Sequence, residues 1–172
     1  ARFRIVHCQI TTEELIDKLR KYNIIADIQP TFVSTDLSIV ESRIGKKRAK
    51  WTYNWKTLLD KGINMGAGSD CPVEFFNPLL GIYSAVTRKN LQGYPEEGWL
   101  PEQKISVAEA LYLFTMGSAY SSFEEELKGS ISPGKLADIA VLSEDIFSIP
   151  SDDIKSIKVE KTIVGGKFLY ES

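Results

Sequence analysis

The chain has 172 residues, enough for a domain with a substantial hydrophobic core. Its hydrophobic fraction of 43% and charged fraction of 26% are typical of a globular protein. With 21 basic and 23 acidic residues the formal net charge is −2, which argues against nucleic acid or an anionic membrane as a partner. No apolar stretch approaches the roughly 20 residues that a bilayer-spanning helix needs. The two cysteines, Cys8 and Cys71, form no metal-type pair, so we expect free, buried thiols and a cytoplasmic location.

The first half of the chain alternates short apolar runs with helical patterns. Residues 3–8 are apolar and β-branched enough for a buried strand. Thr11 and Glu14 predict a capping box that opens a helix reaching Tyr22. Further strands are predicted at 24–28 and 63–68. Between them we predict a long connection at 31–52 and a helix at 53–61. A connection of that length is functional or carries a short helix. This order predicts a parallel sheet built from right-handed crossovers.

The second half changes from helical to β-rich composition. Asn77 and Pro78 predict a helix that runs to about residue 88, and a surface loop follows at 90–104. Ser106 and Glu109 predict a second capping box and helix. A strand at 137–142 and a hairpin at 157–170 with a Gly165–Gly166 turn follow. We therefore predict an α/β part at 1–126 and a β-rich part at 127–172.

Three polar residues follow the predicted parallel strands. His7 comes at the end of the first strand, Gln29 after the second and Asp70 after the third. The active groups of a β/α barrel lie at the C-terminal ends of its parallel strands. His7 and Asp70 thus suggest part of a hydrolytic metal centre, and Gln29 could reach a substrate. The simpler alternatives are a hydrogen-bonded core histidine, a loop-anchoring glutamine and a helix-capping or turn aspartate.

The ordered stretches RIVHCQI, ADIQPTF, NMGAGSDCPV, EEGWLPEQKISVAEAL and GSISPGKLADIAVL resemble the amidohydrolase superfamily over essentially the whole chain. Within it, they look most like the C-terminal part of the branch that includes N-substituted formamide deformylases. The resemblance implies the last three strands, with their helices, of a (β/α)8 TIM barrel. It also implies that residues 134–139 lead into the strands of a small composite β-sandwich.

The same resemblance implies roles for the strand-end residues. His7 matches a metal-binding histidine, and Asp70 matches an aspartate that contacts the metal and serves as general base. A divalent metal would activate water and polarise a carbonyl. Neutral imidazole suits zinc, with nickel, iron or manganese as alternatives. The expected substrate is a small amide or formamide.

The chain departs from the family pattern in ways that limit what it can do alone. Val6 stands where the family usually has glutamate, and the paired histidines of the first barrel strand have no counterpart, since His7 is the only histidine. One His and one Asp fall short of the three protein ligands of catalytic zinc. We therefore expect that the chain by itself binds little or no metal, is inactive and self-associates through exposed sheet edges. The alternatives are a deaminase or cyclic-imide hydrolase of the same superfamily, or a non-catalytic α/β interaction module.

Overall fold

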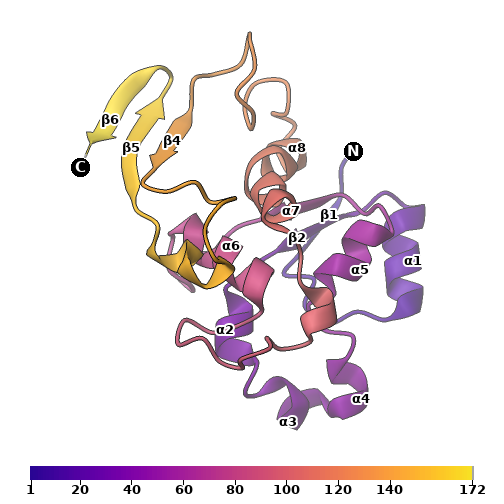
Figure 1. Ribbon diagram of the computed structural model, residues 1–172. Helices are drawn as coiled ribbons and strands as arrows, with labels where there is room; N and C mark the ends of the chain where they lie inside the picture. The colour runs from indigo at the N-terminus through magenta and orange to yellow at the C-terminus, as the bar shows by residue number, and fades with distance from the viewer. Residues whose placement is uncertain (172) are drawn as a thin grey trace.

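The computed structural model describes residues 1–171, and in these residues the strands form two three-stranded sheets (Figure 1). The first sheet is parallel, in the order β1 (Arg4–Val6), β2 (Ile25–Ile28) and β3 (Met65–Ala67). The second is antiparallel, in the order β4 (Ile139–Leu142), β5 (Val159–Val164) and β6 (Lys167–Glu171). Both sheets lie where the sequence pattern predicts them.

Two helices cover the parallel sheet, α1 (Glu13–Lys21) and α5 (Trp55–Asp60), and Lys61 after α5 bonds Asp17 of α1 at 2.7 Å. Strands β2 and β3 contribute small and aliphatic side chains to one buried apolar cluster with these helices. Its members there are Ala26, Ile28, Met65, Ala67, Ile16, Leu19 and Leu58. Burying each large aliphatic side chain in this way stabilises the folded state by about 1.5–3 kcal/mol. Strand β1 is different: it is exposed at one edge of the sheet, whereas β3, at the other edge, is covered by residues 113–121. The prediction that β1 would be buried is wrong.

The cap of α1 also differs from the prediction. The hydroxyl of Thr12, not Thr11, accepts the Leu15 N–H at 3.2 Å. Thr11 is buried, and both its backbone N–H and its hydroxyl donate to the carbonyl of Trp51. Pairing between the segments around Thr11 and Trp51 takes this threonine away from the helix, so the predicted capping box does not form.

The long connection after β2 is mostly helical. It contains three short helices, α2 (Phe32–Asp36), α3 (Val40–Ile44) and α4 (Lys46–Ala49). Because Phe32 and Asp36 are four residues apart, they lie on one face of α2. That face meets the segment that follows β1, where Phe32 stacks on His7 and Asp36 accepts a hydrogen bond from Gln9.

The helices after β3 are α6 (Pro78–Thr87), α7 (Val107–Tyr112), a π-helical stretch η2 (Leu113–Gly117) and α8 (Ser118–Ser121). A short 3₁₀ turn, η1 (Pro101–Gln103), precedes α7. Ser106 and Glu109 form the predicted capping box. Beside β3, the Ser118 hydroxyl accepts the Ala67 N–H at 3.3 Å and donates to the Ala67 carbonyl at 2.9 Å. The backbones approach so closely here that a Cβ on Gly117 would lie 2.2 Å from the Met65 carbonyl oxygen.

The C-terminal segment is attached through the 3₁₀ helix η3 (Ser151–Ser156), which packs on α6. Ile146, Ile154 and Ile157 are buried in the same apolar cluster as residues of α6. Gly165 and Gly166, with φ of 56° and 77°, form the predicted turn between β5 and β6. The division of the chain at residues 126 and 127 stays a prediction.

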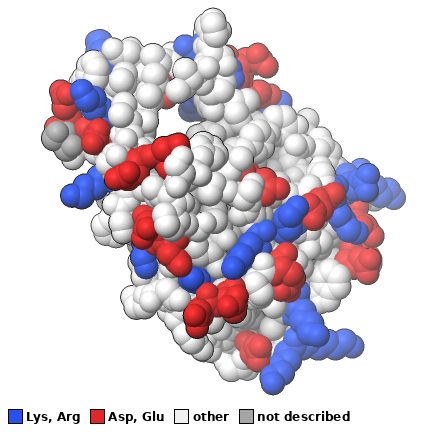
Figure 2. Space-filling view, viewed as in Figure 1, with Lys and Arg blue, Asp and Glu red and all other residues white. Residues whose placement is uncertain are grey.

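The surface carries both signs of charge. In the face shown in Figure 2, acidic and basic side chains are interspersed, with a largely uncharged area between them. Among the helices of residues 1–171, none combines the length and the apolar character that a bilayer crossing requires.

The contact between Gly117 and Met65 predicts a strong effect of Gly117→Ala. The added Cβ would clash with backbone, which cannot rotate away, so we expect a loss of about 1–3 kcal/mol in the free energy of unfolding. Gly68→Ala is the matched control, because open space surrounds the Cβ position at Gly68. Urea denaturation of both variants measures the difference. Equal stability of the two variants would show that η2 does not pack against β3 in this way.

Candidate functional site

His7 and Gln29 come together at the carboxyl edge of the parallel sheet. The Nδ1 atom of His7 lies 2.7 Å from Oε1 of Gln29, and the imidazole stacks on Phe32 with ring centroids 5.6 Å apart. His7 is half-buried and Gln29 is buried. Parallel strands end at the same edge of a sheet, so residues separated by more than twenty positions meet here.

The contact with Gln29 defines which nitrogen of His7 is free. An amide oxygen can only accept, so Nδ1 carries the proton and donates to Gln29. The lone pair of Nε2 is then available, and imidazoles that bind metals are held by this kind of hydrogen bond at the other nitrogen. The structure therefore gives Gln29 a clear task, the orientation of His7. Its predicted contact with a substrate stays a prediction.

The backbone at two of the strand ends is strained. His7, Cys8 and Asp70 have φ values of 69°, 44° and 58°, in the left-handed region that non-glycine residues rarely occupy. Such conformations cost roughly 1–3 kcal/mol each and are found preferentially at functional sites. His7 directly follows β1, and Asp70 lies three residues beyond the end of β3.

Asp27 is a fourth polar residue of this region, and the sequence analysis missed it. It pairs in register with Val6 of β1, and Arg4 of β1 donates to its carboxylate at 3.3 Å. Burial raises the pKa of Asp27, the positive charges of Arg4 and His7 oppose this rise, and the negative charge of Asp70 adds to it. Asp27 is therefore close enough to interact electrostatically with both predicted metal ligands. A charged residue inside an otherwise buried strand was the signal that could have identified it.

The donors in the chain fit a metal in kind but not in number. No cluster of three or more His, Cys, Asp or Glu side chains suited to a metal ion occurs among residues 1–171. His7 and Asp70 offer one imidazole and one carboxylate, whereas catalytic zinc takes three protein ligands. The described residues therefore do not make a complete metal site.

The two cysteines lie in different environments. Both are free thiols, and Cys8 is buried as predicted, which raises the pKa of its thiol. Cys71 is exposed, so the prediction of a buried thiol is wrong there. It follows Asp70 in a surface turn, beyond the end of β3.

Comparison with known proteins shows the family. The model of the amidohydrolase family matches residues 1–170, and the chain belongs to this family. It is 39% identical over 168 residues to the Bacillus subtilis (strain 168) protein named "Putative amidohydrolase YtcJ", covering 98% of this chain and 32% of that protein. A solved structure of an uncharacterized metal-dependent hydrolase from Pyrococcus horikoshii OT3 superposes with a TM-score of 0.75 at 26% identity. That match covers 86% of this chain and 30% of the other.

The formamide deformylase branch is supported less strongly. The chain is 30% identical to the N-substituted formamide deformylase of Arthrobacter pascens over 116 residues, which is 67% of this chain and 21% of that protein. In these comparisons the chain spans about a third or less of its relatives' length. The fold is that of the last barrel strands and the following sheet of an amidohydrolase, as the resemblance implied.

The raised pKa of Asp27 predicts the effect of pH on Asp27→Asn. A folded-state pKa above the ordinary 3.8 means that the folded protein holds this proton more tightly. The associated stability is present below the ordinary pKa and is lost as the pH rises through the folded value. Asparagine has no carboxyl group to ionise, so its variant does not lose this stability as the pH rises. The variant should therefore unfold at a higher urea concentration than the parent at pH 7.

Near about pH 3 the advantage of Asp27→Asn should disappear, because the aspartate is then protonated in both states. Asp153→Asn, an exposed aspartate of η3, is the control and should change stability by less than about 0.5 kcal/mol at either pH. A less stable Asp27→Asn variant at pH 7 would mean that the ion pair with Arg4 outweighs burial.

Proposed function

We propose that this chain forms the C-terminal part of a metal-dependent hydrolase that cleaves the C–N bond of a small amide or formamide. The observation that carries the proposal is the pair His7 and Gln29, in which the imidazole is oriented with Nε2 free at the carboxyl edge of the sheet. Family membership and the metal-dependent relative support it. The strained backbone at His7 and Asp70 supports it further.

In this proposal His7 and Asp70 are two of the metal ligands, and zinc is the metal that the imidazole favours. The remaining ligands would come from elsewhere in a longer protein, as the relatives are about three times the length of the chain. Asp70 is the general base: its carboxylate takes a proton from the attacking water and returns it to the leaving nitrogen. Asp27 adds negative charge beneath this edge and would help to hold a cation there.

The proposal can be tested with the single histidine as a probe. Because His7 is the only histidine, its ring protons give unambiguous NMR signals. Two ligands bind a metal weakly, so we expect only a large excess of Co²⁺ to broaden these signals selectively. Gln29→Ala should weaken this binding about 10-fold by releasing the imidazole. Asp70→Asn should weaken it as well, whereas Asp153→Asn should not.

The outcomes of this titration separate the alternatives. Selective broadening that depends on Asp70 supports the metal ligands proposed here. Unchanged His7 signals even at a large excess of Co²⁺ would remove His7 from the metal ligands proposed here. Broadening that is insensitive to Asp70→Asn would remove Asp70 from the metal ligands.

The isolated chain should not hydrolyse amides, because its donors are too few. We expect no release of amine or carboxylate from small amides and formamides when Zn²⁺ is added to the purified chain. The paired measurement is the same assay on Asp70→Asn, which reports contaminating activity. Hydrolysis by the parent chain that Asp70→Asn abolishes would contradict the incomplete site.

For partners and location, we propose a small-molecule substrate, no nucleic acid or membrane, and the cytoplasm, where the free thiols of Cys8 and Cys71 persist. The mixed surface charge agrees with the absence of a nucleic-acid partner (Figure 2). The chain itself should self-associate through β1, whose outer edge is open and whose Phe3 and Ile5 side chains are exposed.

Self-association through β1 predicts that Ile5→Lys lowers the average mass of the chain in solution. A lysine on an edge strand disfavours strand pairing between copies. Leu15→Lys, at an equally exposed position on α1, is the control and should leave the mass unchanged. Analytical ultracentrifugation measures both. A monomeric parent chain would refute the proposal.

A further inference from the structure

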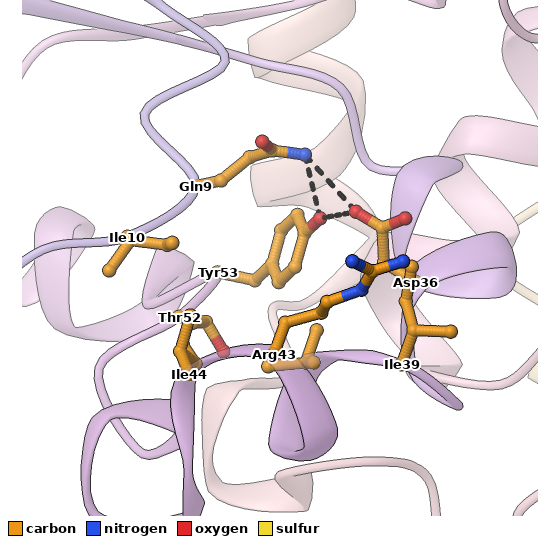
Figure 3. Close-up of a pocket in the computed structure, with 9 residues that line it drawn as sticks. Gln9, Ile10, Asp36, Ile39, Arg43, Ile44, Thr52 and Tyr53 are labelled. Atoms are coloured by element: carbon orange, nitrogen blue, oxygen red, sulfur yellow. Dashed lines mark hydrogen bonds between the residues drawn. The ribbon is translucent and has the colours of Figure 1, made fainter.

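A small cavity lies beside the His7 edge of the sheet, between the segment after β1 and the helices after β2. Its volume is about 130 Å³. Four of its nine lining residues are aliphatic, and Figure 3 shows how polar groups gather along one side. The aliphatic residues are Ile10, Ile39, Val40 and Ile44.

The walls of the cavity are held by backbone hydrogen bonds. Tyr53 donates its N–H to the Gln9 carbonyl at 2.8 Å, Thr11 donates to Trp51 at 2.9 Å, and Ile10 forms a bridge with Thr52. Behind them, the buried Arg88 donates to the Tyr53 carbonyl at 3.0 Å. The cavity is therefore pre-formed, so a ligand would not have to order its walls on binding.

The polar side of the cavity is internally satisfied. The Tyr53 hydroxyl donates to the carboxylate of Asp36, and the Gln9 amide donates to Tyr53 at 2.8 Å and to Asp36 at 3.2 Å (Figure 3). Burial and the negative charge of Asp36 raise the pKa of Tyr53 above its ordinary range, so the hydroxyl remains a donor. These groups do not require a polar ligand to complete their hydrogen bonds.

The cavity also has no net charge of its own. Asp36 is its acidic lining residue and Arg43, exposed at the rim, its basic one. The opposite signs largely cancel for a ligand held between them. Neither a cation nor an anion is favoured by such a lining, whereas an uncharged apolar group gains contact with four aliphatic side chains.

Short covalent and packing links join the cavity to the candidate site. Gln9 is two residues from His7 on the same segment. Phe32, which stacks on His7, and Asp36, which bonds Tyr53, occupy one face of α2. The cavity therefore shares one wall segment and one helix with His7.

We propose that this cavity is a substrate subsite that receives a compact, uncharged apolar group, a phenyl ring or a branched alkyl group attached to the amide. An enclosed apolar cavity of about 150 Å³ is known to bind benzene. The cavity here has a similar volume, about 130 Å³, and is open on one side. The cavity as a binding site stands on its own geometry. Only its assignment to a substrate rests on the proposed hydrolytic function.

The test is a titration of the purified chain with benzene, monitored by the methyl NMR signals of the isoleucines and valines. We expect saturable shifts confined to the four lining residues, with a Kd on the order of 1 mM. Val40→Phe and, at the exposed rim, Ile39→Trp should each abolish the shifts by filling the space. Leu15→Phe on α1 is the matched control and should bind benzene like the parent chain.

Circular dichroism melts of each variant establish that it is folded, and the rim variant keeps the test valid if Val40→Phe does not fold.

Absence of shifts at saturating benzene overturns the subsite. Tighter binding of benzoate or benzylammonium than of benzene overturns the assignment to an uncharged group. Benzene shifts without any cobalt effect on His7 retain the cavity but refute its role in a hydrolase. A cobalt effect on His7 without benzene shifts supports the proposed hydrolase but refutes the cavity as a subsite.

Discussion

The parallel pairing of β1, β2 and β3 is the constraint on which the rest of this structure depends. Its register places the ends of three strands, separated by long stretches of chain, at one edge. That edge collects an imidazole, an amide and two carboxylates. The helices on the buried face of the sheet hold the strands together through apolar contacts, and Ser118 hydrogen-bonds the open backbone of β3.

One turn of helix connects the two functional features proposed here. The same face of α2 presents Phe32 to His7 and Asp36 to Tyr53. A shift of α2 would move the stacking partner of the imidazole and the polar side of the cavity together. This coupling is a direct consequence of the four-residue helical repeat, since a strand in its place would send the two side chains to positions too far apart.

Much of the fold could be predicted because local signals agree with the tertiary structure. The strand–helix alternation, the Ser106 capping box and the Gly165–Gly166 turn all occur where the sequence pattern places them. The failures have a common cause. Thr11 pairs with Trp51 and not with α1, Cys71 is left exposed in the turn at Asp70, and β1 lacks the helical cover that η2 and α8 give to β3. Each outcome depends on how segments that are distant in the chain pack together.

The sequence by itself determined the order of the elements and the residues that follow each strand, because periodicity and short motifs record local geometry. Its ordered stretches also carried the resemblance to the amidohydrolase superfamily. Only the tertiary structure decided which of these residues meet. It set Gln29 against His7, placed Asp27 beside Val6 within the field of both predicted ligands, and closed a cavity between Ile10 and α3. Register and packing bring together residues 20 to 40 positions apart, and no local pattern carries that distance information.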